Sequence, residues 1–211
     1  MKQFLVIAGN IGVGKSTLVK ILSERLGWEP FYETVAENPY LADFYADMPR
    51  WAFHSQTFFL TRRLYAHHQL LSRPGVVVQD RSVYEDAEIF ARNLYLQGRM
   101  SERDYATYAD MYGVLKLFLP PPQLVVYLQA SVDTLLKRIA LRGREYEKKM
   151  ERAYLEQLNL LYEEWTANFQ LAPVLTVPAD RLDFVQNNPD LELILDKIQQ
   201  KLRGDQYVLF E

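Results

Sequence analysis

The chain of 211 residues contains no cysteine and no long apolar run. The lack of cysteine excludes disulfides, thiolate metal sites and cysteine nucleophiles, and it suits a reducing compartment. No stretch approaches the ~18 uninterrupted apolar residues of a membrane span, and the apolar run that follows residues 1–3 is too short for a signal peptide. We therefore expect a cytoplasmic protein without a membrane partner.

An excess of charge of one sign is also missing. Lys and Arg together number 24, Asp and Glu 27, and the formal net charge is −3. A surface so balanced does not attract nucleic acid as a whole, so no nucleic-acid partner is expected. Apolar residues make up 49% of the chain, which is enough for a sizeable core. The length fits one domain, and we expect residues 1–211 to form it.

Residues 9–16 read GNIGVGKS, which is the spacing of a phosphate-binding P-loop. Glycines let backbone N–H groups point at phosphate oxygens, and a helix start adds the positive end of its dipole. A glycine-rich turn that merely joins two elements is the alternative. The apolar run before the motif and the helical pattern after it favour the P-loop. The residues expected to hold ATP here are Gly9, Asn10, Gly12, Gly14, Lys15, Ser16 and Thr17.

Five short apolar runs alternate with long helical patterns along the chain. Nearly continuous apolar character is typical of strands buried on both faces, and the alternation predicts an α/β fold with a five-stranded parallel sheet flanked by helices on both faces. The expected strands are 4–8, 31–35, 76–79, 124–128 and 174–177. The expected helices follow the P-loop to residue 26 and cover 51–72, 83–97, 101–119, 132–141, 150–169 and 189–203.

Ser82 and Glu85 have the spacing of a capping box, which predicts the start of the helix at residue 83. The apolar tail, residues 207–210, either adds an edge strand or packs on a neighbouring element. The sequence leaves both possibilities open.

Ligands of open parallel sheets bind at the carboxyl ends of the strands. The P-loop ends the first strand, Glu33 lies near the end of the second, and Asp80 and Arg81 follow the third. We therefore expect these three points to meet in one cleft. Asp80 suits a carboxylate near Mg²⁺, together with the hydroxyl of Ser16. Its alternative is an aspartate that caps a helix or a turn.

Two further side chains in this cleft are candidates for catalysis. Arg81 has the charge to neutralise a transferring phosphoryl group or to orient a carboxylate, and its alternative is a surface ion pair. Glu33 could accept a proton from an attacking hydroxyl, although glutamates near strand ends are common.

Arginines gather at Arg138, Arg142 and Arg144, where a helix runs out into a loop. Such a cluster over a P-loop suggests a lid that clamps phosphates and excludes water. The alternatives are a solvated helix face and a nucleic-acid patch. Interspersed Glu145 and Glu147 weaken the nucleic-acid interpretation.

Gln56 and Arg63 are seven residues apart on a long helix, so they share a face beside aromatic side chains. A glutamine amide offers a donor and an acceptor, as pairing with a nucleobase edge requires, but a satisfied polar contact is the alternative. The three histidines lack chelating partners at suitable spacing, so we expect surface or core histidines and not metal ligands.

Together these motifs resemble the deoxynucleoside kinase family, in particular its bacterial deoxyadenosine and deoxyguanosine kinases, which are related to deoxycytidine kinase. The match covers most of the chain, and its many ordered motifs are more specific than the P-loop alone. The segments that carry it are 9–16, Glu33, 37–41 (ENPYL), 49–53 (PRWAF), Gln56, 80–86 (DRSVYED), 89–95 (IFARNLY) and 138–144 (RIALRGR).

The resemblance implies roles for single residues. Glu33 resembles the base for the 5′-hydroxyl, and Arg81 resembles the arginine that holds this base and the phosphates. Asp80 stands where the family often has Glu, which keeps a carboxylate near the metal but shortens its reach. The other implied groups are Tyr45 with Glu147 for the sugar 3′-hydroxyl, Gln56, Arg63 and Asp86 for the base, and Arg138, Arg142 and Arg144 for a lid over about 142–149.

The activity implied is ATP-dependent phosphorylation of the 5′-hydroxyl of a deoxyribonucleoside in nucleotide salvage, by a homodimer that uses Mg²⁺. Lys15, Arg81 and Glu33 would act at the reacting groups. A charged Arg63–Asp86 pair beside Gln56 suits a base with an acceptor and an exocyclic amine, which favours deoxyadenosine, then deoxyguanosine or deoxycytidine.

Two other functions fit parts of the pattern. A nucleoside monophosphate kinase of the thymidylate kinase type has a similar core, but it needs further basic groups for the acceptor's phosphate. A nucleotide-binding module without turnover is the second alternative. The absence of an Asn-Lys-x-Asp motif counts against a GTPase switch.

Overall fold

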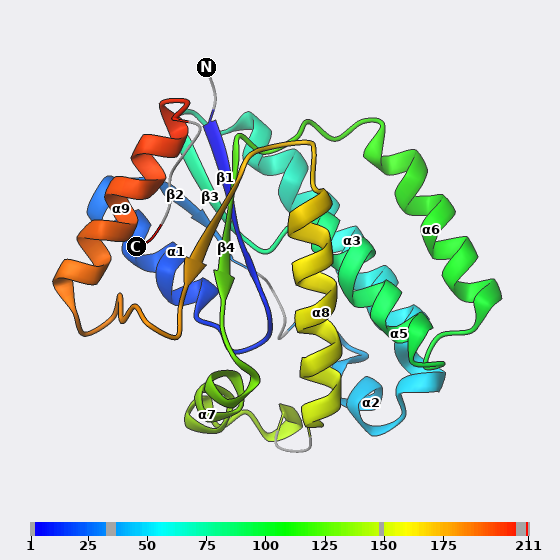
Figure 1. The fold of residues 1–211 in the computed structure, drawn as a ribbon. Coiled ribbons are helices and arrows are strands. Elements are labelled where there is room, and N and C mark those ends of the chain that lie inside the picture. The colour runs from blue at the N-terminus through cyan, green and yellow to red at the C-terminus, as the bar shows by residue number, and fades with distance from the viewer. Residues whose placement is uncertain (1–2, 33–36, 148–149, 206–209, 211) are drawn as a thin grey trace.

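The computed structural model describes residues 3–32, 37–147, 150–205 and 210. A parallel sheet of five strands forms its centre, in the order β2-β3-β1-β4-β5 (Figure 1). The predicted α/β class and five-stranded sheet are confirmed. The strands are β1 (Gln3–Gly9), β2 (Glu29–Phe31), β3 (Val76–Asp80), β4 (Leu124–Gln129) and β5 (Val174–Pro178).

Helices cover both faces of the sheet, because successive residues of a strand point to opposite sides. Phe4 and Val6 of β1 join the core on the side of α3 and α8, whereas Leu5 and Ile7 join the core on the side of α1 and α9. The longer helices are α1 (Lys15–Leu26), α3 (Met48–Ser72), α6 (Glu102–Lys116), α7 (Val132–Arg142), α8 (Arg152–Asn168) and α9 (Asn188–Leu202).

Several element boundaries differ from the sequence-based expectation, most clearly those of the strand expected at 31–35 and of the helix expected at 51–72. The strand expected at 31–35 is observed at Glu29–Phe31, and residues 33–35 of the expected strand lie outside the described part. The helix expected from residue 51 starts at Met48, because Asp47 caps it by accepting a hydrogen bond from the N–H of Arg50 at 3.3 Å. A short helix, α2 (Leu41–Ala46), precedes it and was not expected.

The helix expected at 83–97 is continuous but not uniform. Its first turn is α4 (Val83–Glu85), a π-helical segment follows at Asp86–Ala91, and α5 (Arg92–Leu96) completes it. The predicted capping box between Ser82 and Glu85 is present. π-Helical turns are rare and occur often at functional sites.

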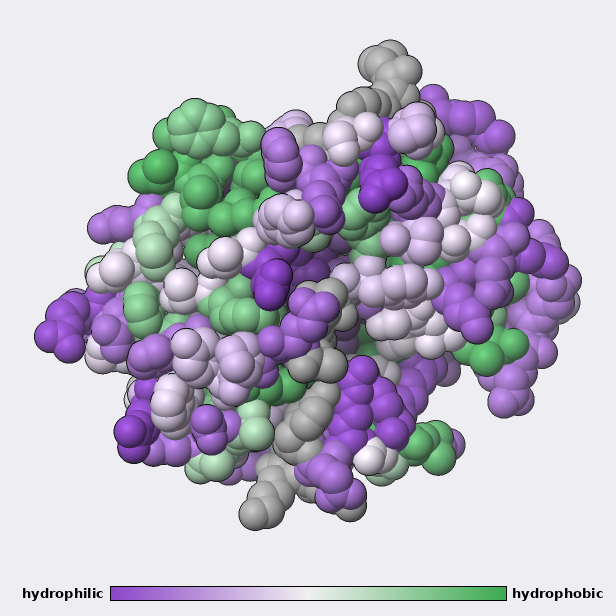
Figure 2. Space-filling view, turned by 180° about the vertical axis from the view of Figure 1, so that it is seen from behind, coloured by the Kyte–Doolittle hydropathy of each residue, from purple (hydrophilic) through white to green (hydrophobic). Residues whose placement is uncertain are grey.

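The surface carries one plain concentration of apolar side chains in the view of Figure 2, at upper left. It lies over the end of α6, where Val114, Leu117 and Phe118 are 59%, 81% and 78% exposed. Within the described ranges, no helix combines the length and the apolar character that crossing a membrane requires. The segment 206–209, which holds most of the apolar tail, lies outside the described residues.

Candidate active site

The P-loop joins β1 to α1 and turns through glycines with positive φ. The φ angle is 144° at Gly9, 83° at Gly12 and 109° at Gly14, a region that other residues rarely adopt. A Cβ atom at Gly12 would also lie 2.6 Å from Cγ1 of Ile139 on α7. The predicted strand, glycine loop and helix are therefore observed, and the loop packs directly against α7.

Lys15 is buried, and its ammonium group turns back onto the loop. Nζ donates to the carbonyl oxygen of Gly9 at 2.9 Å and to that of Asn10 at 3.0 Å. The Asn10 side chain is held by α8, where Nδ2 donates to the carbonyl of Leu155 at 3.0 Å and to Oδ1 of Asn159 at 2.7 Å. This side chain therefore shapes the loop, and only the backbone of Asn10 remains for contact with a nucleotide.

Ser16 and Asp80, the predicted metal ligands, are in contact. The Ser16 hydroxyl donates to Oδ2 of Asp80, whose residue is 1% exposed. Oδ1 of Asp80 is buried and has no hydrogen-bond partner in the part of the chain that the structure describes. Mg²⁺ takes oxygen ligands, usually one or two from the protein beside phosphate oxygens and water. The chemistry of this pair therefore fits Mg²⁺.

The histidines were predicted to be surface or core residues. The described residues contain no group of three or more His, Cys, Asp or Glu side chains that could hold a metal ion. His67 is buried against Phe4, with ring centroids 5.2 Å apart. His67 is therefore a core histidine, which is one of the two predicted possibilities.

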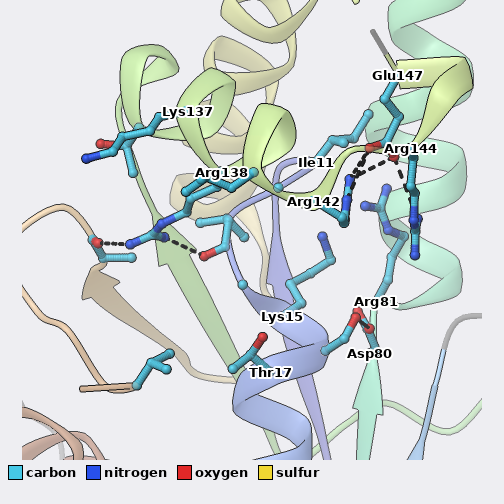
Figure 3. A pocket seen from close by; sticks show the side chains of 18 of the residues that line it. Ile11, Lys15, Thr17, Asp80, Arg81, Lys137, Arg138, Arg142, Arg144 and Glu147 are labelled. Carbon is cyan, nitrogen blue, oxygen red and sulfur yellow. Dashed lines mark hydrogen bonds and ion pairs between the residues drawn. The ribbon is translucent and has the colours of Figure 1, made fainter. Parts of the chain in front are cut away.

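Arg81 occupies a strained turn at the end of β3. It is the only described residue other than glycine with positive φ, at 65°. Such a conformation costs about 1–3 kcal/mol and persists where the surrounding structure enforces it. The N–H of Arg81 donates to the carbonyl of Ile7 at 3.1 Å, and its guanidinium lies 4.0 Å from the ring centre of Phe90. The turn aims the guanidinium at the space above Lys15 (Figure 3).

The three residues predicted to recognise the base are brought together. Gln56 and Asp86 line the same pocket as the P-loop. Arg63 stands beside them, where Nε donates to Oδ2 of Asp86 at 3.0 Å and Nη1 donates to the carbonyl of Asp80 at 2.9 Å. All three side chains are at least nine-tenths buried. The predicted Arg63–Asp86 pair thus exists as a buried ion pair.

The predicted lid arginines are tied to the residue predicted to bind the sugar. Arg142 donates to both carboxylate oxygens of Glu147, with Nη2 at 2.7 Å from each. Arg144 approaches the same carboxylate at 3.6 Å (Figure 3). Glu147, in a 3₁₀ turn (Glu145–Glu147), is buried, and Tyr45 of α2 lines the same pocket. Residues 148–149 of the expected lid lie outside the described part.

Arg138 differs from the other two arginines. Its Nη1 donates to the carbonyl of Val13 at 2.7 Å, and its Nη2 donates to the carbonyl of Ala179 at 2.9 Å. These bonds join α7 to the P-loop and to the chain after β5. The guanidinium still lines the pocket, but in this structure it supports the backbone.

Most of these groups border one cavity of about 860 Å³, whereas Arg63 is not among its lining residues and reaches it through Asp86. The P-loop and the arginines form one side, and α2, α3 and the π-helical segment form the other. Figure 3 shows Lys15, Arg81 and Arg142 pointing into the same space between the two sides. Burial raises the pKa of Tyr154, another lining residue, to about 12, so its phenol stays protonated at neutral pH.

Sequence analysis missed several lining residues. The largest missed group is the segment 179–186 after β5, whose Phe184 approaches Gly14. The rule that ligands bind at carboxyl ends of strands applies to β5 as well, and would have indicated this segment. The aromatic lining residues Phe44, Phe59 and Phe90 carried no comparable signal, because apolar side chains on helices are usually core.

Glu33, the predicted base, lies outside the described residues. The last residue of β2, Phe31, pairs with Gln79 of β3, the residue before Asp80. The end of β2 therefore lies beside the chain that leads directly into Asp80.

The comparisons with known proteins agree on one family. A family model described as deoxynucleoside kinase matches residues 5–203. The deoxyadenosine/deoxycytidine kinase of Bacillus subtilis (strain 168) is 38% identical over 206 residues, covering 97% of this chain and 95% of that protein. A deoxyguanosine kinase of Lactobacillus acidophilus (strain ATCC 700396 / NCK56 / N2 / NCFM) is 38% identical over 208 residues, covering 94% and 90%.

The solved structures lead to the same family. Deoxyadenosine kinase from M. mycoides, with the products dCMP and a flexible dCDP bound, superposes with a TM-score of 0.83 at 35% identity. The match covers 95% of this chain and 100% of the other. The resemblance predicted from the motifs is thereby confirmed, and the chain belongs to the deoxynucleoside kinase family.

Proposed function

We propose that this protein transfers the γ-phosphoryl group of ATP to the 5′-hydroxyl of a deoxyribonucleoside, as a step of nucleotide salvage. The observation that carries the proposal is that one cavity of about 860 Å³ is lined both by a P-loop and by the buried side chains of Gln56 and Asp86, the latter held by Arg63. The P-loop suits the phosphate donor, and the polar set suits a nucleobase. A single cavity brings both substrates into reach of one another, which is the main requirement of phosphoryl transfer.

The donor half consists of the P-loop and the cations around it. Backbone N–H groups of the loop and Lys15 bind the phosphates, and Arg81 stabilises charge that develops on the transferred group. Lys15 bonds loop carbonyls in this structure, so nucleotide binding replaces these bonds with bonds to phosphate. The segment 179–186 borders the donor side and is a candidate to enclose the base of ATP.

Ser16 and Asp80 would hold Mg²⁺, which supplies charge neutralisation at the phosphates when bound. The buried, unpartnered Oδ1 of Asp80 supports this assignment. Glu33 would accept the proton of the 5′-hydroxyl. This role is supported by the pairing of Phe31, the last residue of β2, with Gln79, which directly precedes Asp80.

The acceptor half distinguishes between bases. Arg63 holds the Asp86 carboxylate through Nε, and this carboxylate can accept a hydrogen bond from an exocyclic amine. The Gln56 amide supplies a donor and an acceptor for the neighbouring ring positions. This set favours deoxyadenosine, with deoxyguanosine and deoxycytidine next. The names of the B. subtilis and L. acidophilus relatives fall within these three substrates.

Tyr45 and Glu147 would bond the sugar 3′-hydroxyl, and residues 142–149 would act as the lid. The bonds from Arg142 to Glu147 link these two roles, because closing the lid and seating the sugar involve the same carboxylate. We also propose a single domain over residues 1–211, a homodimer, and a cytoplasmic location.

The test is a phosphorylation screen with ATP and Mg²⁺ over the four deoxyribonucleosides, their ribo counterparts and the nucleoside monophosphates. We expect turnover of deoxyribonucleosides with deoxyadenosine best. Turnover of monophosphates alone would replace the proposal by a monophosphate kinase, and ATP binding without any turnover would replace it by a binding module.

The second test concerns the base. Glu33→Gln should lower kcat by about 100-fold or more while the deoxynucleoside still binds, because a general base contributes about that factor. Wild-type turnover in this variant would remove Glu33 from the mechanism.

A further inference from the structure

Glu85 carries a carboxylate with no exposed surface. One of its oxygens closes the capping box, since the N–H of Ser82 donates to Oε2 at 2.8 Å. The other oxygen reaches elsewhere in the chain. Oε1 accepts from the N–H of Gly9 at 3.2 Å and from the hydroxyl of Tyr162 at 2.8 Å. One carboxylate therefore connects the P-loop, the turn after β3 and α8.

The two backbone groups that Glu85 holds flank the reacting site. Gly9 is the first residue of the P-loop, and Ser82 directly follows the strained Arg81. The distance between these segments sets the distance between the donor phosphates and the Arg81 guanidinium. Two hydrogen bonds to the two oxygens of a single rigid carboxylate restrict that distance from both sides.

Tyr162 orients this carboxylate. Its hydroxyl also lies 2.8 Å from the carbonyl oxygen of Gly9, which accepts the bond from Lys15. The ring stacks on Tyr127, with centroids 5.5 Å apart and planes 11° from parallel. The hydroxyl is therefore fixed by packing and cannot follow the carboxylate if the latter moves.

Helix capping alone does not explain this arrangement. Ser101 caps α6 in an exposed position, without any buried carboxylate. Burial raises the pKa of Glu85, whereas the charges of Arg81 and Lys15 lower it. An enclosed carboxylate is costly unless hydrogen bonds and opposite charges compensate, and here both compensating groups belong to the catalytic site.

We infer that Glu85 is a positioning residue that sets the spacing between the P-loop and Arg81 for phosphoryl transfer, and that Tyr162 orients it. The inference rests on the proposed kinase activity. Neither residue is among the described side chains that line the cavity, so both act through the groups they hold.

The test is Glu85→Gln, which keeps the shape of the side chain. An amide presents one NH₂ group, so it faces either the N–H of Gly9 or that of Ser82 with a donor, and one of the two bonds is lost. We expect kcat to fall by about 10- to 100-fold, since a small displacement of reacting groups has effects of that size. KM for the deoxynucleoside should stay within about threefold, because the described hydrogen bonds of the Glu85 side chain go to Gly9, Ser82 and Tyr162, on the phosphate-donor side of the cavity.

Four further variants separate positioning from stability and charge. Glu85→Asp keeps the charge but is too short to serve both sides, so its kcat should be as low as that of Glu85→Gln. Tyr162→Phe should lower kcat less than Glu85→Gln does. The double variant, Glu85→Gln with Tyr162→Phe, should be no slower than Glu85→Gln alone, because the two side chains act as one unit.

Glu88→Gln is the matched control, since Glu88 accepts hydrogen bonds from Tyr112, Lys116 and Trp165 away from the cavity.

The control should lose stability without losing kcat. A kcat within twofold of wild type in Glu85→Gln or Glu85→Asp overturns the inference, and so does an equal loss in Glu88→Gln. If Glu85→Gln does not fold, an unchanged kcat in Tyr162→Phe overturns it. Wild-type protein in the same assay separates the two proposals. If the wild type phosphorylates no deoxynucleoside, the proposed function is contradicted. If the wild type is active and the Glu85 variants keep its kcat, only the positioning role is contradicted.

Discussion

Some buried polar side chains in this protein form hydrogen bonds with two partners each. Arg63 holds Asp86 and the backbone of Asp80, and Lys15 bonds two loop carbonyls where a kinase would bind phosphate. A buried polar group must find partners, because leaving it unpaired costs ~1–3 kcal/mol. A buried atom without a partner in the described part of the chain is therefore informative, and Oδ1 of Asp80 is such an atom.

Asp80→Asn should weaken the binding of Mg²⁺. The substitution removes the charge that the proposed site offers to the cation, so activity at saturating Mg²⁺ should fall by about 10- to 100-fold and its midpoint should shift to higher free Mg²⁺. Activity measured across a Mg²⁺ titration checks this. Asp133→Asn, an exposed carboxylate outside the site, is the control and should keep the wild-type curve.

His67 should make the protein less stable in mild acid. Burial lowers the pKa of His67 to about 4, from an ordinary value near 6.5. The unfolded chain therefore binds a proton below pH 6.5 that the folded chain does not bind until about pH 4. Its contribution to stability is full above pH 6.5 and is lost as the pH falls, by about 2 kcal/mol between pH 7.5 and pH 5.

Urea unfolding at the two pH values measures this contribution. His67→Gln should reduce the pH dependence by that amount, whereas His68→Gln, an exposed neighbour, should leave it unchanged. Equal pH dependence in wild type and His67→Gln would show that the imidazole is protonated alike in both states.

At the scale of elements, the helix after β3 is the most specialised part of the fold. In its π-helical segment, Asp86–Ala91, Asp86 contacts Arg63 and Phe90 contacts Arg81. Both partners lie outside this helix, in α3 and in the turn after β3. Apolar spacing and the capping box predicted a helix here, but the widened turn depends on contacts with α3 and β3.

The contact between the P-loop and α7 is a second such feature, and Gly12→Ala tests it. The added Cβ meets Ile139 at 2.6 Å, and the positive φ is strained for alanine. We expect KM for ATP to rise by about tenfold or more, and the free energy of unfolding to fall by about 1–3 kcal/mol. ATP titrations and thermal unfolding measure the two effects.

Gly98→Ala separates strain from the clash. Gly98 also has positive φ, at 65°, but a Cβ atom there meets nothing within 4 Å. This variant should lose stability and keep KM for ATP. If KM for ATP rises in both variants, the rise in Gly12→Ala is caused by lower stability and not by the clash at the P-loop.

At the scale of the whole molecule, the proposed homodimer needs a surface on which two copies can bury apolar side chains. The layer of α5 and α8 exposes leucines outward, with Leu96 at 53% and Leu160 at 64%. Arg92 on α5 pairs with Glu164 on α8 at 3.1 Å, which keeps the two helices in register as one surface. Exposed apolar side chains on neighbouring helices suit an isologous interface between two copies.

Leu160→Asp should convert the protein to monomers, because a carboxylate would be desolvated at the centre of the proposed interface. Sedimentation velocity or light scattering measures the mass. Leu193→Asp, an exposed leucine on α9, should remain dimeric. A monomeric wild type, or a dimeric Leu160→Asp variant, contradicts this interface.

Local order along the chain was sufficient for much of this protein. The P-loop, the alternation of strands and helices, and the Ser82–Glu85 capping box each depend on residues a few positions apart, whose spacing dictates backbone conformation. Only the tertiary structure decided which group binds the second oxygen of Glu85, namely the N–H of Gly9, 76 residues earlier in the chain. It also decided that the segment 179–186 lies beside the P-loop. Contacts across such separations depend on which faces of the elements pack together, and this leaves no periodic trace in the sequence.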